Sequence, residues 1–366
     1  MFDAQVVLSP KDSGLGRQLS QYVCLRITRM DETDVGLFDR DWNNTIYFFA
    51  LNAEEQIYLR YGGRDAQSPD TYLNLDSLEL ALRQGLDLHR QYLSGALKLP
   101  DRPKPLFPRE IPLLVKRTFA QRQCVECHLI GDFQNIQREE EGVLDKLTHL
   151  YRSPDIKTLG IALDVPKGLV VKGARGAAQA SGMKAGDRIA SWNGAPVWTF
   201  GDLQYRYDTV DRRAGKIAVE VRRDGQNGVQ GGADRDGNPV SLTIALPERW
   251  WWTDLRFRQS SVDPRFDFED RPLTAEEKSK LGLAADGFAS QVKYVSEFAK
   301  VRKTHELRTG DIIYAVDAVE RDELANTAEL FLKLRKKAGQ SAMLSVIRTG
   351  QRIQMPLQTY VLSFRK

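Results

Sequence analysis

The stretch that decides the fold is Lys184-Ala185-Gly186-Asp187-Arg188-Ile189-Ala190-Ser191-Trp192-Asn193, because the chain contains it twice. The second copy reads Arg308-Thr309-Gly310-Asp311-Ile312-Ile313-Tyr314-Ala315-Val316-Asp317. Residues 219–225 likewise match residues 344–350, and a predicted helix precedes each of these, over 200–210 and 327–337. Since the two offsets agree to within one residue, the sequence predicts two homologous modules of roughly 90 residues each.

An apolar-Gly-apolar triplet precedes the repeated stretch in both modules, Leu159-Gly160-Ile161 in the first and Leu281-Gly282-Leu283 in the second. In the first module a strand, a run of small residues, the Gly-Asp pair, an Asn-Gly turn, a helix and a strand ending in Arg-x-Gly follow in that order. This order closely resembles PDZ domains of the bacterial type, as found in the periplasmic high-temperature-requirement proteases. The resemblance covers over half of the chain.

The resemblance implies peptide capture. An extended peptide would add as a strand beside the module's helix, and backbone N–H groups of the triplet would hold a terminal carboxylate. The alternative is that the same residues only build the two cores. The second module also departs from the pattern, with Asp317-Ala318 in place of Asn193-Gly194 and His305 in place of Ser181, which puts its groove in question. The first predicted groove comprises Leu159, Gly160, Ile161, Ala162, Leu203 and Tyr207, and the second comprises Leu281, Gly282, Leu283, Leu330 and Leu334.

A second motif lies between the modules and the amino-terminal part. Cys124-Val125-Glu126-Cys127-His128 fits the C-x-x-C-H pattern of haem c attachment, in which two thiols bind the porphyrin and the histidine is the proximal iron ligand. A redox-active cysteine pair is the main alternative. Zinc is a third one, with His149 as a further ligand but no evident fourth.

A haem would need a second axial ligand, for which His149 and Met183 are candidates. His89 is expected on an amphipathic helix, at its surface or in its core-facing stripe. Cys24 lies in the middle of a predicted strand and is expected to be a small buried hydrophobe. Trp250-Trp251-Trp252 is expected to be a packing joint between the modules.

The amino-terminal part reads as α/β. Alternating apolar residues predict strands over 21–27, 44–51 and 56–61, and helical spacing predicts a helix over 73–93. This order resembles the back half of a thioredoxin-like unit without its first strand and redox motif. The predicted fold class is therefore α/β plus mostly-β, a truncated thioredoxin-like domain followed by two PDZ domains. The predicted divisions are 1–98 thioredoxin-like, 99–152 Pro-rich linker and C-x-x-C-H segment, 153–248 first PDZ domain, 249–272 aromatic connector and 273–362 second PDZ domain.

The whole order resembles the thioredoxin-like/PDZ (seleno)protein family of planctomycetes and related bacteria. Its signature stretches here are Tyr22-Val23-Cys24-Leu25-Arg26, Tyr58-Leu59-Arg60-Tyr61-Gly62-Gly63, Cys124–His128 and residues 252–258. Members carry a cysteine or selenocysteine redox motif just upstream of the segment that matches Phe2-Asp3-Ala4-Gln5-Val6-Val7. We therefore expect a misplaced start codon, and a thioredoxin-like part that is inactive as the chain is written.

Composition excludes several classes. The 53 Lys and Arg residues balance 49 Asp and Glu residues, so no nucleic-acid partner is indicated. The apolar runs are far shorter than the ~20 residues that a membrane-spanning helix needs. No signal peptide is visible, although the family resemblance and haem c chemistry both imply a periplasmic or otherwise extracytoplasmic location.

Two functions from different classes remain. The favoured one is a non-proteolytic protein that binds extended or C-terminal peptides through its PDZ domains and carries a redox or haem c site. No Gly-x-Ser-x-Gly stretch accompanies the modules. The alternative is a thiol or selenol oxidoreductase whose redox motif lies upstream of the start and whose PDZ domains recruit substrates. A regulator of a protease, the third reading, rests on analogy alone.

Overall fold

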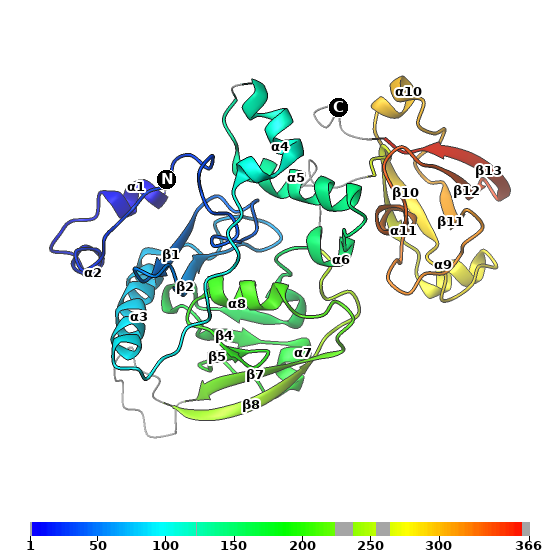
Figure 1. Ribbon diagram of the computed structural model, residues 1–366. Helices are drawn as coiled ribbons and strands as arrows, with labels where there is room; N and C mark the ends of the chain where they lie inside the picture. The colour runs from blue at the N-terminus through cyan, green and yellow to red at the C-terminus, as the bar shows by residue number, and fades with distance from the viewer. Residues whose placement is uncertain (1, 122, 224–236, 254–263, 361–366) are drawn as a thin grey trace. The chain divides into compact units, whose positions relative to one another are not determined.

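The structure is a computed structural model that describes residues 2–121, 123–223, 237–253 and 264–360, and its chain divides into two units, residues 1–257 and 258–366 (Figure 1). The fold is mixed α/β with several small sheets.

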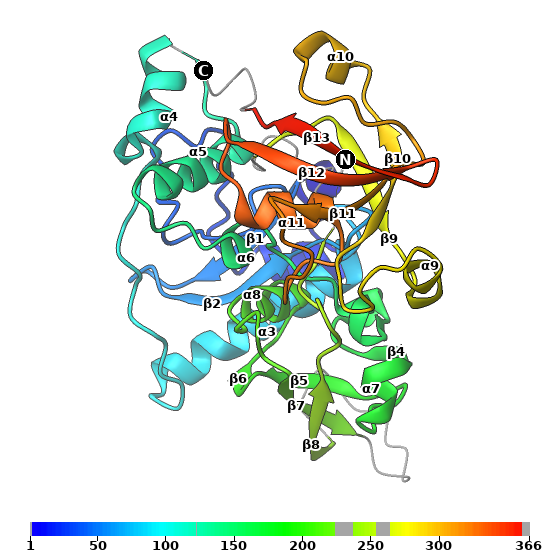
Figure 2. The same ribbon diagram turned by 90° about the vertical axis from the view of Figure 1, so that its right-hand side faces the viewer.

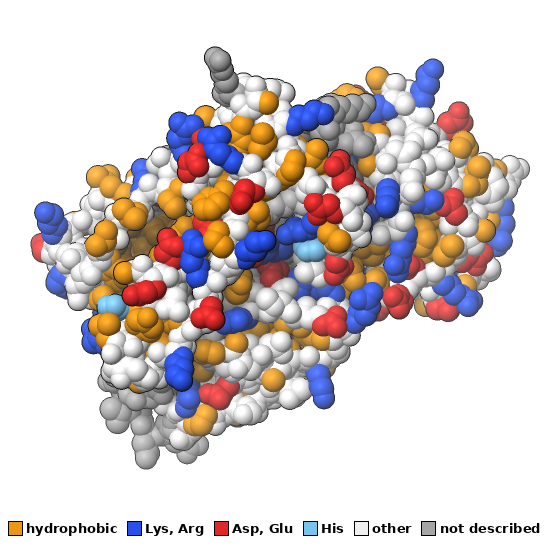
Figure 3. Space-filling model, in the orientation of Figure 1, with side chains coloured by type: hydrophobic (Ala, Val, Ile, Leu, Met, Phe, Trp, Pro, Cys, Tyr) orange, Lys and Arg blue, Asp and Glu red, His pale blue; other side chains and the backbone are white. Residues whose placement is uncertain are grey.

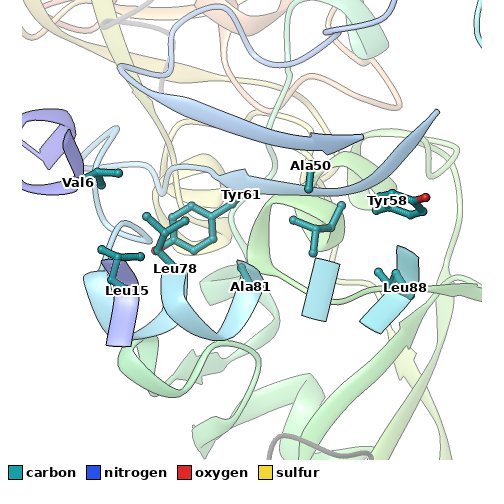
Figure 4. Packing of buried hydrophobic residues seen from close by; sticks show 9 residues of the cluster. Val6, Leu15, Ala50, Tyr58, Tyr61, Leu78, Ala81 and Leu88 are labelled. Carbon is teal, nitrogen blue, oxygen red and sulfur yellow. The ribbon is translucent and has the colours of Figure 1, made fainter. Parts of the chain in front are cut away.

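The amino-terminal part is a two-stranded antiparallel sheet covered by one long helix. Strands β1 (Tyr47–Leu51) and β2 (Ile57–Gly62) pair as predicted, and α3 (Leu75–Leu93) follows. The Asn74 side chain caps α3 by accepting the N–H groups of Asp76 and Ser77. Leu78, Ala81 and Leu88 face β2, while Val6 and Leu15 arrive from α1 (Phe2–Val7) and α2 (Gly14–Leu19), as Figure 4 shows.

The predicted strand over 21–27 is not formed. The segment is extended, but it pairs with no strand in the described part of the chain. Its apolar alternation therefore stays exposed, with Val23 at 91% and Leu25 at 88% exposure. Cys24 is exposed as well, so the expectation of a buried cysteine was wrong. A thioredoxin-like sheet is not shown by the two strands that do form.

A helical segment joins the amino-terminal part to the first module. It follows the Pro-rich stretch that was predicted as a linker. Its helices are α4 (Pro112–Arg117), α5 (Cys127–Glu140) and α6 (Lys146–His149), with short 3-10 turns at Pro108–Glu110 and Phe119–Gln121. The C-x-x-C-H motif runs into the first turn of α5, which begins at Cys127.

The first module contains a two-stranded and a four-stranded sheet, the latter in the order β6-β5-β7-β8. Its helix α8 is capped by the Thr199 side chain, which accepts from the Asp202 N–H group. The elements are η3 (Ile156–Leu159), β3 (Ile161–Leu163), η4 (Val165–Lys167), β4 (Val171–Ala174), α7 (Gly176–Ala180), β5 (Arg188–Trp192), β6 (Ala195–Pro196), α8 (Phe200–Asp208), β7 (Lys216–Arg223) and β8 (Asn238–Ala245).

The second module is one five-stranded antiparallel sheet in the order β13-β12-β11-β10-β9, with β9 at the edge (Figure 2). Thr327 caps α11 as Thr199 caps α8. The elements are β9 (Phe268–Pro272), α9 (Ala275–Lys280), β10 (Ser290–Val295), α10 (Phe298–Arg302), β11 (Ile312–Val316), α11 (Ala328–Arg335), β12 (Ser341–Arg348) and β13 (Gln351–Gln358).

The repeat predicted from the sequence is confirmed by matching ion pairs and backbone hydrogen bonds in the two modules. In the first module Asp187 forms an ion pair with Arg223 at 2.7 Å, and Asp311 forms one with Arg348 at 2.6 Å in the second. Gly186 and Asp187 bond the backbone of Val171, and Gly310 and Asp311 bond Val292 in the same way. The Asp317-Ala318 turn keeps the left-handed conformation of Asn193-Gly194, with φ of 49° and 64° against 51° and 78°.

The second module begins earlier than predicted. Strand β9 starts at Phe268, inside the residues 249–272 that we predicted as a connector. Leu281-Gly282-Leu283 lies after α9, in the connection between β9 and β10, so it does not occupy the place that Leu159-Gly160-Ile161 has in the first module. The misassignment arose because α9 and its flanking turns lengthen this connection.

The tryptophan cluster packs within the first unit. Trp250 stacks on Tyr207 at 4.8 Å between ring centroids, and Trp251 meets the ring of Tyr151 edge-on at 4.9 Å. Trp252 is half exposed. Trp250 and Trp251 therefore pack against the first module and against the segment that precedes it.

Candidate functional sites

The first candidate site is the face of the first module formed by α8 and β3. Leu159, Leu203 and Tyr207 are fully buried there, and Ile161 is 1% exposed. Gly160 has φ +85°, and a Cβ atom on it would lie 2.0 Å from the Arg175 carbonyl oxygen. The structure thus brings these predicted residues together around the loop, with Ala162 exposed beside them.

The amino-terminal part covers the outer side of α8. The Gln204 amide holds both backbone groups of Arg64, accepting its N–H at 3.1 Å and donating to its carbonyl at 2.8 Å. The Arg60 N–H donates to Asp202 at 2.8 Å, and the Thr199 hydroxyl donates to the Arg60 carbonyl. Backbone groups of β2 and of the turn after it are therefore held by side chains of α8 and of its N-cap.

Aromatic and charged side chains complete this contact. The rings of Tyr72 and Phe200 stack, and the Arg60 guanidinium lies 3.8 Å from the centre of the Tyr205 ring. Burial raises the pKa of Asp202 to about 6, against the lowering effect of Arg60. The covering residues and α8 belong to the same unit, so this side of α8 is covered by the protein's own amino-terminal part.

The second candidate site is the edge of β9 beside α11. Strand β9 pairs only with β10 among the described residues. The Leu273 N–H donates to Ala289, on the β10 side, so the alternation of the strand directs Phe268, Asp270 and Pro272 toward the free edge. Pro272 has no N–H to offer there, a position at which an edge strand tolerates proline.

Helix α11 is fixed to β9 at its first turn. Asp270 accepts the Glu329 N–H at 3.0 Å and the Ser290 hydroxyl at 2.6 Å. Burial and the neighbouring Glu329 raise the pKa of Asp270 to about 7. Of the predicted groove residues on this helix, Leu330 is 4% exposed and Leu334 is partly exposed. The face therefore combines a free strand edge with a helix held beside it.

The third candidate site is the C-x-x-C-H motif. Cys124 is exposed, and Cys127 is the first residue of α5, where helix N–H groups are unpaired. Arg40 donates to the Cys127 sulfur at 3.6 Å. His128 is half exposed and lies 3.5 Å from the carboxylate of Glu126. The two thiols are both free.

The predicted axial ligands, Met183 and His149, are not gathered around His128. Met183 is buried in the first module. His89, which was expected on a helix, lies in α3, where its ring bonds the Tyr58 hydroxyl at 2.7 Å. The His149 ring accepts the Asp145 N–H at 3.1 Å, and its carbonyl bonds Asn135, which lies about 10 Å along α5 from His128. The described residues hold no group of three or more His, Cys, Asp or Glu side chains suited to a metal ion.

On the face that Figure 3 shows, Lys and Arg side chains are interspersed with Asp and Glu, and neither charge forms a large patch. This agrees with the balanced charge of the sequence. Among the described residues no helix has the length and apolar character needed to cross a membrane.

No family model and no curated protein matches the chain. Two similar solved structures are "HtrA-type protease AlgWS227A with decapeptide", at 19% identity, and "HtrA-type protease AlgW with tripeptide", at 18%. They cover 40% and 39% of this chain, 41% and 44% of their own chains, and have TM-scores of 0.24 and 0.22. The chain thus spans about two fifths of the length of these proteins, and likeness at this level does not identify it.

Proposed function

We propose that the protein is a non-proteolytic, extracytoplasmic peptide-binding protein with two PDZ-like modules, and that its second module captures extended segments of partner proteins by strand addition. The observation that carries this proposal is the free edge of β9 beside α11. Backbone groups of Phe268 and Asp270 are directed toward that edge, which suits an added strand.

The first module supports this division of roles. Side chains of its helix α8 bond the backbone of Arg60 in β2 and of Arg64 in the turn after it. Its own groove side chains are buried. We therefore assign partner binding to the second module, and internal docking to the first.

The proposal is tested with random ten-residue peptides displayed on phage and selected on the full chain. A recovered peptide is then N-methylated at one residue at a time. Strand addition predicts that binding falls at every second position, because alternate N–H groups enter the ladder. Equal tolerance at all positions would contradict it.

A matched pair of variants locates the site. Leu334→Glu places a charge on the partly exposed side of α11 and is expected to weaken binding at least tenfold. Ala162→Glu places the same charge on β3, on the first module, and is expected to leave binding unchanged. The reverse result would assign binding to the first module.

A second candidate function is thiol redox chemistry at Cys124 and Cys127. It is favoured by the position of Cys127 at the start of α5, three residues after Cys124, with an Arg40 guanidinium donor beside its sulfur. Oxidation of the two thiols to one disulfide would reduce a partner disulfide to two thiols. Haem c, held by Cys124, Cys127 and His128, would instead supply one-electron transfer; the charged neighbours Arg40 and Glu126 suit it less well.

One experiment separates these two chemistries. The protein is produced with a cytochrome c maturation system and stained for haem after denaturation. A stain that disappears in the double variant Cys124→Ala/Cys127→Ala would establish haem c. No stain, together with two thiols that interconvert with a disulfide, would support the redox pair.

A further inference from the structure

The loop that precedes β9 differs from its counterpart in the first module at one residue. Asp267 occupies the position of Gly160: both have positive φ, +48° and +85°, and both carbonyl oxygens accept an N–H at 2.9 Å, from Ser296 and Arg175 respectively. The following residues, Phe268 and Ile161, pair with the last residues of β10 and β4. The second module thus has an aspartate where the first has a glycine.

The Asp267 carboxylate is buried and fully engaged. Its side chain is 4% exposed. It accepts the Tyr360 hydroxyl at 2.7 Å, the Arg302 guanidinium at 2.8 Å and the Thr304 hydroxyl at 3.2 Å. These donors hold a negative charge in place at the start of the free strand, and Arg302 is no longer available to a second carboxylate.

We propose that the second module binds internal segments of its partners and that Asp267 is the residue that excludes a terminal carboxylate. This inference rests on the proposed function of the same site. A peptide terminus entering the loop would bring a second negative charge and would find Arg302 already paired with Asp267, so no cation there would compensate it. A chain that continues past the loop carries no charge at that point and meets no such penalty.

An internal segment of the chain also docks on the first module. The segment around Arg60 and Arg64 has no terminus and is held by the side chains of Asp202 and Gln204 on α8, while β2 itself pairs with β1 and not with β3. Strand addition requires only backbone groups, which an internal segment supplies as well as a terminal one. The occupant of the second module is therefore expected to be an extended segment flanked by chain on both sides.

The test uses two phage libraries of the same random ten-residue segments. In one the segment ends in a free carboxylate, and in the other a fixed Gly-Ser tail follows it. The full chain is expected to enrich the tailed library. For a recovered sequence, removing the tail should weaken binding at least tenfold, and amidating the new end should restore most of it.

Two variants connect the result to Asp267. Asp267→Asn keeps hydrogen-bonding capacity without the charge, and is expected to remove the difference between free and amidated ends. Asp267→Gly suits the positive φ and recreates the first module's residue, and is expected to favour the free carboxylate. The Asn variant decides the question if the Gly variant does not fold.

The outcomes are distinguishable. Enrichment of neither library would remove the proposed function itself. Enrichment of the free-carboxylate library by the unmodified chain would leave peptide binding intact and overturn the role of Asp267.

Discussion

At the scale of single residues, two buried aspartates hold together segments that are far apart in the sequence. Asp202 is the clearest case, because its carboxylate accepts the backbone N–H of Arg60 across the contact between α8 and β2. Asp267 is a second one, held by Arg302 and Tyr360 at the start of β9. Each is a residue whose substitution changes a contact between segments far apart in sequence.

The raised pKa of Asp202 predicts that the stability of the folded protein depends on pH. Its pKa is raised from 3.8 to about 6, so the folded state keeps a proton that the unfolded chain has already lost. The stability that this residue contributes therefore falls as the pH rises from about 4 to about 6 and changes little above. Asp202→Asn should flatten this part of a plot of Tm against pH, whereas the exposed control Asp211→Asn should not.

The contact of Arg40 with Cys127 predicts how fast this thiol is alkylated. Because its guanidinium contacts the Cys127 sulfur, Arg40→Gln should slow alkylation of Cys127 by iodoacetamide at pH 7 several-fold. Cys24 and Cys124 provide internal controls, since both are exposed and should keep their rates. Mass spectrometry of tryptic peptides measures all three; equal rates before and after the change would contradict the assigned role.

At the scale of elements, α8 is buried on two sides. Leu203 and Tyr207 face the core of the module, while Gln204 and Asp202 face the chain that covers it. Helix α11 in the second module has no such cover among the contacts described within its unit. The same element thus serves internal packing in one copy and remains beside a free strand edge in the other.

The Gln204 contact predicts a measurable loss of stability. Gln204→Ala removes two hydrogen bonds to the buried backbone of Arg64, which should cost about 1–3 kcal/mol. Urea unfolding followed by tryptophan fluorescence measures this value. Gln179→Ala, on the exposed side of α7, is the control, and a loss of equal size there would show that the effect is not specific.

The sequence predicted the elements of the two modules well where the same stretch occurs twice. It predicted them poorly between β9 and β10, where α9 lengthens the connection. Gly282 lies 29 residues before Asp311, close to the 27 residues between Gly160 and Asp187, so the spacing favoured the wrong triplet. Asp267 lies 44 residues before Asp311 and has no glycine to mark its turn. Residues 268–272 read Phe-Glu-Asp-Arg-Pro, without apolar alternation, so the sequence carried no periodic signal for this strand.

At the scale of the whole molecule, the chain divides into two compact units, residues 1–257 and 258–366. The amino-terminal part, the helical segment and the first module form one unit because contacts such as that between Arg64 and Gln204 connect residues 140 positions apart. A single sequence contains no periodicity that reveals such a pairing. The cysteine motif could be found by its spacing, but its neighbour Arg40, 87 residues earlier, could not.

The division into units predicts which fragments fold. Residues 258–366 contain a complete five-stranded sheet and should unfold cooperatively as an isolated fragment. Residues 153–248 alone would expose the polar and aromatic groups of α8 that β2 covers, and should be markedly less stable than the same module in residues 1–257. Thermal melts by circular dichroism compare them; equal melting temperatures for the two forms of the first module would contradict the described contact.

The shared irregularity in the ladders has a consequence for the history of the chain. Pairing skips one residue between Val171 and Gly173 in β4, and again between Val292 and Tyr294 in β10, and the residue passed over is a lysine in both, Lys172 and Lys293. A defect of this kind, at matched places and with the same residue type, is simplest to explain by duplication of one ancestral gene segment. Since that event the copies have diverged, because α8 is covered by its own chain while the outer edge of β9 pairs with no strand in the described part of the chain.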